Sequence, residues 1–227
     1  MLFLSVLLFF HRNFLLMQSR RFGYYFDYAA STPVDRRVVE AMLPYTMDRF
    51  GNPGSLHSYG QQALAALDAS RATIANAFGV AFDQVVFTSG ATEANNLALL
   101  GVVSFWKRMH PAPPFVPRVI VSAIEHESVL APARYLSQQG IVDLIIVPVD
   151  PMGRVDFDFF SHALTAHTIF VSIMAGNNEV GTIQPIERIG AFIREFRQNN
   201  SVAYPLFHVD AAQAAAYTPF FINELGV

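Results

Sequence analysis

A turn able to bind phosphate is the first feature of the sequence with chemical content. An apolar run begins at Val85 and stops at Gly90, and a helix-forming run follows, which predicts a strand, a tight turn and a helix. Thr88 and Ser89 are candidate N-caps for this helix. The unpaired amides of a helix N-terminus, the helix dipole and the Thr92 hydroxyl can bind a dianionic phosphate without a lysine. The alternative interpretation is an ordinary capped helix in an α/β protein.

Three later apolar runs also end in polar side chains. These are His126, then Asn177 and Asn178 with Glu179, then Asp210 with Gln213 three residues beyond it. Because an open α/β sheet binds ligands at the carboxyl ends of its strands, we expect these groups to converge. A carboxylate such as Asp210 at the end of a buried strand needs a cationic or protonated partner. A single histidine in such a place is otherwise a structural residue, so the interpretation depends on all the groups together.

Taken together, the four clusters describe one ligand. It has an anion bound at a helix N-terminus, an aromatic ring stacked on the imidazole of His126, a ring nitrogen kept protonated by Asp210, and a ring oxygen near Gln213. Pyridoxal 5'-phosphate has all of these features, and a protonated ring nitrogen makes its ring an electron sink. The sequence therefore predicts a site for this cofactor, and it predicts no metal site.

Strands and helices alternate along the chain. Apolar runs predict strands at 24–28, 85–87, 118–124, 142–149, 168–174 and 205–209. Helical spacing of apolar residues predicts helices at 34–45, 61–78, 92–106, 128–139, 156–166 and 186–198. This alternation predicts βαβ units, and hence an α/β fold with a mostly parallel sheet flanked by helices.

Composition narrows the class of protein. Of the 227 residues, 52% are hydrophobic and 15% are charged, which excludes a disordered chain. A net charge of -3 and the lack of any basic cluster argue against a nucleic-acid partner. There is no cysteine, and the single lysine is Lys107. A nucleotide-binding fold is a weaker alternative, because no glycine fingerprint opens the first helix.

The first 22 residues form an apolar leader that we expect to lie outside the fold. Their apolar runs are shorter than the roughly 20 residues that cross a bilayer, and they lack the features of a secretory signal, so no membrane association is predicted. Met17 is a candidate translation start, and an amphipathic, arginine-bearing transit peptide is the alternative interpretation of these residues. We expect residues 23–37 to form an N-terminal segment that packs with a small domain, and residues 38–227 to form an incomplete cofactor-binding large domain.

Six stretches of the sequence resemble a known family. They are residues 25–33, 51–57, 88–93, 125–127, 177–181 and 208–213. In this order they resemble motifs of the class V aminotransferases, and within that family the bacterial cysteine desulfurases. The likeness extends from about residue 24 to the end of the sequence.

The resemblance implies a fold, an activity and roles for individual residues. It implies the large domain of the fold type I pyridoxal-phosphate enzymes, a cytoplasmic homodimer, and release of sulfur from L-cysteine for iron–sulfur cluster assembly or tRNA thiolation, with a sulfur acceptor or scaffold protein as partner. The catalytic residues it implies are His126 and Asp210, and the cofactor-binding residues are Ala91, Thr92, His126, Asn178, Asp210 and Gln213.

The sequence departs from the family pattern in two residues. The family has a lysine that binds the cofactor covalently and a cysteine that receives sulfur, and neither is found at a matching position. We therefore expect an N-terminal portion without the small C-terminal domain, inactive by itself in sulfur transfer. A selenocysteine lyase, another class V transferase or lyase, and a non-catalytic dimerisation fragment are the alternatives.

Overall fold

The centre of the molecule is a parallel sheet. The computed structural model describes residues 23–218 and 222–225, so the expected leader lies outside the described residues. Four strands form the sheet in the order β2-β1-β3-β4, and every neighbouring pair is parallel. Their bounds are β1 Arg118–Ser122, β2 Asp143–Val147, β3 Thr168–Ser172 and β4 Leu206–His208. The predicted parallel sheet is thus confirmed, with strands slightly shorter than the apolar runs.

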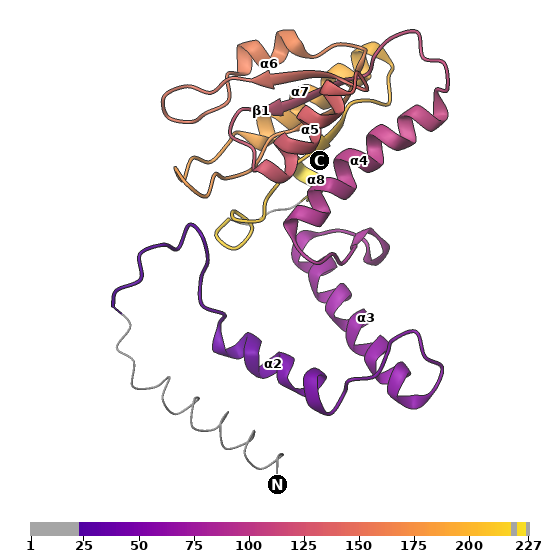
Figure 1. The fold of residues 1–227 in the computed structure, drawn as a ribbon, viewed down its shortest axis with the longest axis vertical. Coiled ribbons are helices and arrows are strands. Elements are labelled where there is room, and N and C mark those ends of the chain that lie inside the picture. The colour runs from indigo at the N-terminus through magenta and orange to yellow at the C-terminus, as the bar shows by residue number, and fades with distance from the viewer. Residues whose placement is uncertain (1–22, 219–221, 226–227) are drawn as a thin grey trace.

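Helices cover both faces of this sheet (Figure 1). Successive side chains of a strand point to opposite faces, so Val119 and Val121 of β1 pack in one core and Ile120 in the other. The first core is closed by α4 (Ala91–Met109) and α5 (Glu127–Gln138). The second is closed by α6 (Phe157–Ala163), α7 (Ile186–Asn200) and α8 (Ile222–Leu225). Each predicted helix of this part is confirmed to within a few residues.

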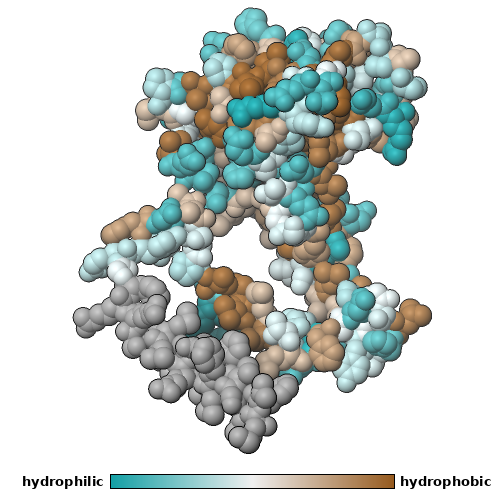
Figure 2. Space-filling view, viewed as in Figure 1, coloured by the Kyte–Doolittle hydropathy of each residue, from teal (hydrophilic) through white to brown (hydrophobic). Residues whose placement is uncertain are grey.

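The N-terminal helices lie apart from the sheet. In Figure 1, α2 (Arg36–Met47) and α3 (Ser58–Phe78) extend away from it, and the 3-10 helix η1 (Phe82–Gln84) leads back to α4. Figure 2 shows apolar side chains on the surface of α2 and along α4. No residue of α2 is buried. Both helices match the sequence prediction, but the apolar face of α2 is exposed and that of α3 is mostly half-buried.

Two predicted strands do not form. Residues 24–28 are an exposed irregular segment and a turn, and residues 85–87 are extended without a strand partner among the described residues. Arg71 of α3 donates a hydrogen bond to the Val85 carbonyl, and its guanidinium lies 5.0 Å from the centre of the Phe87 ring. A strand needs a paired neighbour, and the described sheet places none beside these residues, so the Val85 carbonyl is satisfied by a helix side chain.

Within 23–218 and 222–225, no helix is both long enough and apolar enough to cross a bilayer.

Candidate functional site

A cavity of about 500 Å³ lies at the carboxyl ends of the strands. Its lining includes a residue from each of the four polar clusters, as the convergence of strand ends predicts. The lining residues are Ala29, Ala30, Ser89, Gly90, Ala91, Thr92, Glu93, His126, Met174, Gly176, Asn178, Asp210, Ala212 and Gln213. All six expected cofactor-binding residues are among them.

The N-terminus of α4 forms one wall of the cavity. Gly90 is the N-cap and has no side chain with which to cap the helix, so the expectation that Thr88 or Ser89 caps it is wrong. The Thr88 hydroxyl instead donates to the Gly90 carbonyl at 3.1 Å, and the Ser89 amide donates to the Glu93 carboxylate at 2.6 Å. Hydrogen bonds from the Ser89 side chain and backbone lower the pKa of Glu93. The first amides of α4 beside Thr92 have no intrahelical acceptor, and they can bind an anion.

His126 lies at the start of α5. It is the N-cap of that helix, and its Nδ1 accepts a hydrogen bond from the Ser128 amide at 3.1 Å. The Ser128 Oγ lies 2.7 Å from the same nitrogen. The imidazole is therefore fixed through Nδ1, while the residue borders the cavity.

The two asparagines after β3 have different places. Asn177 builds the turn: its Oδ1 accepts from the amides of Glu179 and Val180 at 2.9 and 3.0 Å, and its Nδ2 donates to the Ile124 carbonyl at 3.2 Å. Asn178 lines the cavity. Asn177 thus joins the loops after β1 and β3, and Asn178 is the member of the pair that can contact a ligand.

Asp210 is the buried acid of the site, with 9% of its surface exposed. Its Oδ1 accepts from the Ala212 amide at 3.0 Å, and its Oδ2 accepts from the Asn95 side chain at 2.8 Å. Gln213 follows on the cavity wall and is exposed. A carboxylate with two donors and no cationic partner among the described residues is suited to a positively charged ligand atom.

A second buried acid, Glu125, holds the strand ends together. Its carboxylate accepts from the hydroxyls of Ser122 and Ser172 at 2.6 and 2.9 Å and from the Met174 amide at 2.6 Å. Burial raises the pKa of Glu125. Burial also lowers the pKa of His208, whose Nδ1 lies 2.9 Å from the Ser172 Oγ. Glu125 therefore ties the end of β1 to β3 directly beside His126.

Sequence reasoning missed several of these groups. Glu125 stands within the motif at 125–127 and Ser128 directly follows it, but the sequence analysis gives neither a role, and it does not place Ala29 and Ala30 at the cavity. Asn95 had a usable signal: it is in helical register with the buried Leu99 and Val103 of α4, and a polar residue on a buried face requires a partner.

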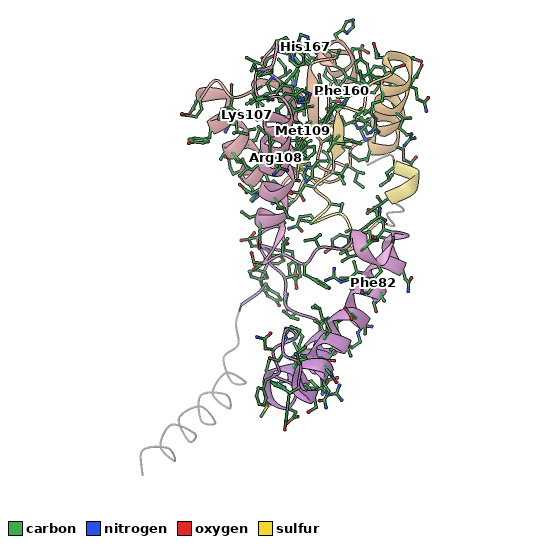
Figure 3. All side chains as sticks on the ribbon, turned by 90° about the vertical axis from the view of Figure 1, so that its right-hand side faces the viewer. Phe82, Lys107, Arg108, Met109, Phe160 and His167 are labelled. Carbon is green, nitrogen blue, oxygen red and sulfur yellow. The ribbon has the colours of Figure 1, made fainter. Side chains whose placement is uncertain are left out.

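The one lysine lies far from the cavity. Lys107 is exposed at the C-terminal end of α4, beside Arg108 and Met109, and Figure 3 shows these residues well separated from Phe82, which precedes that helix. Sixteen residues separate Lys107 from Ala91, which at 1.5 Å per residue is about 24 Å.

Comparisons with known proteins agree with this geometry. Cysteine desulfurase IscS 1 of Archaeoglobus fulgidus is 43% identical over 202 residues, covering 89% of this chain and 49% of that protein. Cysteine desulfurase IscS of Dictyoglomus turgidum is 40% identical over 205 residues, with coverage of 89% and 48%. The chain thus spans about half the length of the curated relatives it matches.

Solved structures share the fold. A NifS-like protein superposes with a TM-score of 0.80 at 36% identity, covering 91% of this chain and 53% of the other. SspA in complex with cysteine superposes with a TM-score of 0.79 at 34% identity, covering 90% and 55%. These likenesses confirm the expected large-domain fold of the pyridoxal-phosphate transferases. The family model described as Aminotransferase class-V matches residues 24–227, and the chain belongs to this family of pyridoxal-phosphate enzymes.

Proposed function

We propose that this chain supplies the cofactor-binding part of a pyridoxal-phosphate-dependent cysteine desulfurase. The observation that carries the proposal is the single cavity in which the N-terminus of α4, His126, Asn178, Asp210 and Gln213 meet. The names of the relatives support the choice of cysteine as substrate, and one structural neighbour is described in complex with cysteine.

The described residues fit the phosphate end of the cofactor. The amides of Ala91 and Thr92 and the Thr92 hydroxyl are donors at a helix N-terminus, where the dipole favours an anion. The Ser89 amide is already taken by Glu93, so the helix amides carry this role.

The other polar residues of the cavity fit the ring. Asp210 is buried and held by two donors, so it would hold a proton on the ring nitrogen, and Gln213 would donate to the ring oxygen. His126 would stack on the ring and Asn178 would lie beside the ring and substrate. When the cofactor is bound, its protonated ring withdraws electrons from the substrate carbon that bears the substrate's amino group.

Ligand titration tests the cofactor assignment. Pyridoxamine 5'-phosphate, followed by its fluorescence, is expected to bind the purified chain, and pyridoxamine without phosphate is expected to bind far more weakly. Equal affinity for the two compounds would contradict a phosphate site at the start of α4.

A chimaera tests the activity. Residues 24–227 would be fused to the remaining half of the Dictyoglomus turgidum relative, which is 40% identical over the shared part. We expect sulfide release from L-cysteine, abolished by Asp210→Asn although some cofactor stays bound. A chimaera that loads with cofactor but only transaminates cysteine would assign the chain to another branch of the family.

The proposal also includes a homodimer that acts in the cytoplasm. Its partner would be a sulfur-accepting or scaffold protein, and the sulfur would be used in iron–sulfur cluster assembly or tRNA thiolation. The exposed apolar side chains of α2, including Val38, Val39 and Met42, support a protein partner for this helix. Analytical ultracentrifugation of the chimaera is expected to give a dimer. A monomer at micromolar concentration would contradict this part.

A further inference from the structure

One buried carboxamide connects two groups of the proposed site. Asn95 of α4 is 3% exposed, and its Nδ2 lies 2.8 Å from the Asp210 Oδ2 and 2.9 Å from the Ser128 Oγ. The Ser128 Oγ in turn lies 2.7 Å from Nδ1 of His126. His126 and Asp210 both line the ligand cavity, on the loops after β1 and β4, and α4 supplies the residue that joins them.

The donors and acceptors in this row of hydrogen bonds follow from Asp210 at one end and His126 at the other. Both carboxylate oxygens of Asp210 accept hydrogen bonds, so Asn95 presents its amide nitrogen and not its oxygen. The same nitrogen donates to Ser128 Oγ, which leaves the Ser128 hydroxyl proton for His126. The Ser128 backbone amide also donates to Nδ1. Nδ1 of His126 is therefore an acceptor, and a neutral ring carries its proton on Nε2.

We infer that Asn95 is a positioning residue, which orients Asp210 directly and, through the Ser128 hydroxyl, strengthens the preference of His126 for the Nε2–H tautomer. The inference deepens the proposed function, on which it rests for the roles of Asp210 and His126. One side chain thereby sets two contacts with the ring: the acceptor for its nitrogen and the proton position of the stacked imidazole.

The neighbouring Asn96 separates this role from simple helix packing. Its Nδ2 donates to the carbonyls of Thr92 and Ser128 at 2.8 and 3.2 Å, so it also joins α4 to the start of α5. No hydrogen bond joins its side chain to Asp210 or His126 in the described part of the chain. Asn96→Ala is therefore a matched control for Asn95→Ala.

Nuclear magnetic resonance of the imidazole nitrogens provides a readout that packing alone does not change. With nitrogen-15-labelled histidine at about pH 8, where an ordinary imidazole is neutral, the wild-type chain is expected to show His126 as a single Nε2–H tautomer. Asn95→Ala removes the donor that orients the Ser128 hydroxyl, and Ser128→Ala removes the hydroxyl itself, so the Ser128 backbone amide is the one fixed donor left to Nδ1. Both variants are expected to show a measurable fraction of the Nδ1–H form beside the Nε2–H form. Ser128→Thr keeps the hydroxyl and is expected to restore the single form, and Asn96→Ala is expected to leave it unchanged.

The carboxyl carbon of Asp210 distinguishes the effect of Asn95 on Asp210 from its effect on His126. Its carbon-13 resonance should shift in Asn95→Ala and stay in place in Ser128→Ala. A wild-type ring protonated on Nδ1, or His126 and Asp210 signals that are the same in all folded variants, would overturn the inference. If Asn95→Ala does not fold, the wild-type tautomer and the serine variants decide the question.

Binding of pyridoxamine 5'-phosphate, measured on the same samples, keeps the two proposals distinguishable. Wild-type protein with the expected tautomer but no affinity for the compound would contradict the cofactor assignment and leave the role of Asn95 standing. Normal affinity with the wrong tautomer would overturn the role of Asn95 alone.

Discussion

The sheet unit (residues 118–218) and the N-terminal arm (residues 23–90) are built from equally apolar sequence but differ in what covers it. Every residue of β3 is buried, whereas none of the twelve residues of α2 is. Both parts line the cavity, the first through His126 and Asp210 and the second through Ala29 and Ala30. The spacing of apolar residues therefore determines whether a segment forms a helix or a strand. Whether that segment is buried depends on another part of the molecule, or a partner, that packs against it.

The largest expected effect tests this difference in stability. Phe160 of α6 is fully buried between the sheet and α7, so Phe160→Ala should lower the free energy of unfolding by about 3–5 kcal/mol. Leu56 in the arm is 93% exposed, and Leu56→Ala should change it by less than about 0.5 kcal/mol. Urea unfolding of both variants measures the contrast, and similar losses would mean that the arm is packed in solution.

The next effect concerns the place where the arm meets α4. Thr92→Ala removes a hydroxyl that would donate to a charged phosphate, so the affinity for pyridoxamine 5'-phosphate should fall by about 1.5–3 kcal/mol. Thr73→Ala is the control, because the Thr73 hydroxyl donates within α3 to the Ala69 carbonyl at 2.9 Å. Unchanged affinity in Thr92→Ala would remove Thr92 from the site.

The sequence predicts the sheet unit better than the arm for a physical reason. Buried strands and amphipathic helices leave a local pattern, so β1 to β4 and their helices were found within a few residues. The runs at 24–28 and 85–87 have the same pattern but no strand beside them in the described chain, and pairing is not a local property. Sequence reasoning gave Asn95 no role for a similar cause, since its partner Asp210 is 115 residues away.

The third effect is a pH dependence confined to the sheet unit. Burial raises the pKa of Glu125 above its usual 4.5, so the native state keeps a proton that the unfolded chain has released. As the pH rises from 4.5 through the higher pKa of Glu125 in the native state, the native state loses stability relative to the unfolded chain. Glu125→Gln has no ionisable group at this position and lacks this loss. The stability of Glu125→Gln relative to wild type should therefore increase as the pH rises above 4.5, as measured by urea unfolding from acidic to neutral pH.

The exposed Glu127 is the control for Glu125. Its carboxylate lies 3.5 Å from Arg134 on the surface of α5, and surface pairs contribute little. Glu127→Gln should give a nearly flat difference from wild type over the same range. A flat difference for Glu125→Gln as well would mean that the Glu125 carboxyl is not held in its protonated form by burial.

The smallest expected effect is none, at Lys107. Its amine is carried at the far end of α4, about 24 Å along the helix from Ala91, and no lysine side chain spans that distance. Lys107→Arg should therefore leave the affinity for pyridoxal phosphate unchanged, and borohydride reduction followed by peptide mapping should find no specific cofactor adduct at this position. By the same reasoning the chain alone should release no sulfide from cysteine. A stoichiometric adduct at Lys107 together with sulfide release would show that this lysine reaches the cofactor, and would contradict its placement at the far end of α4.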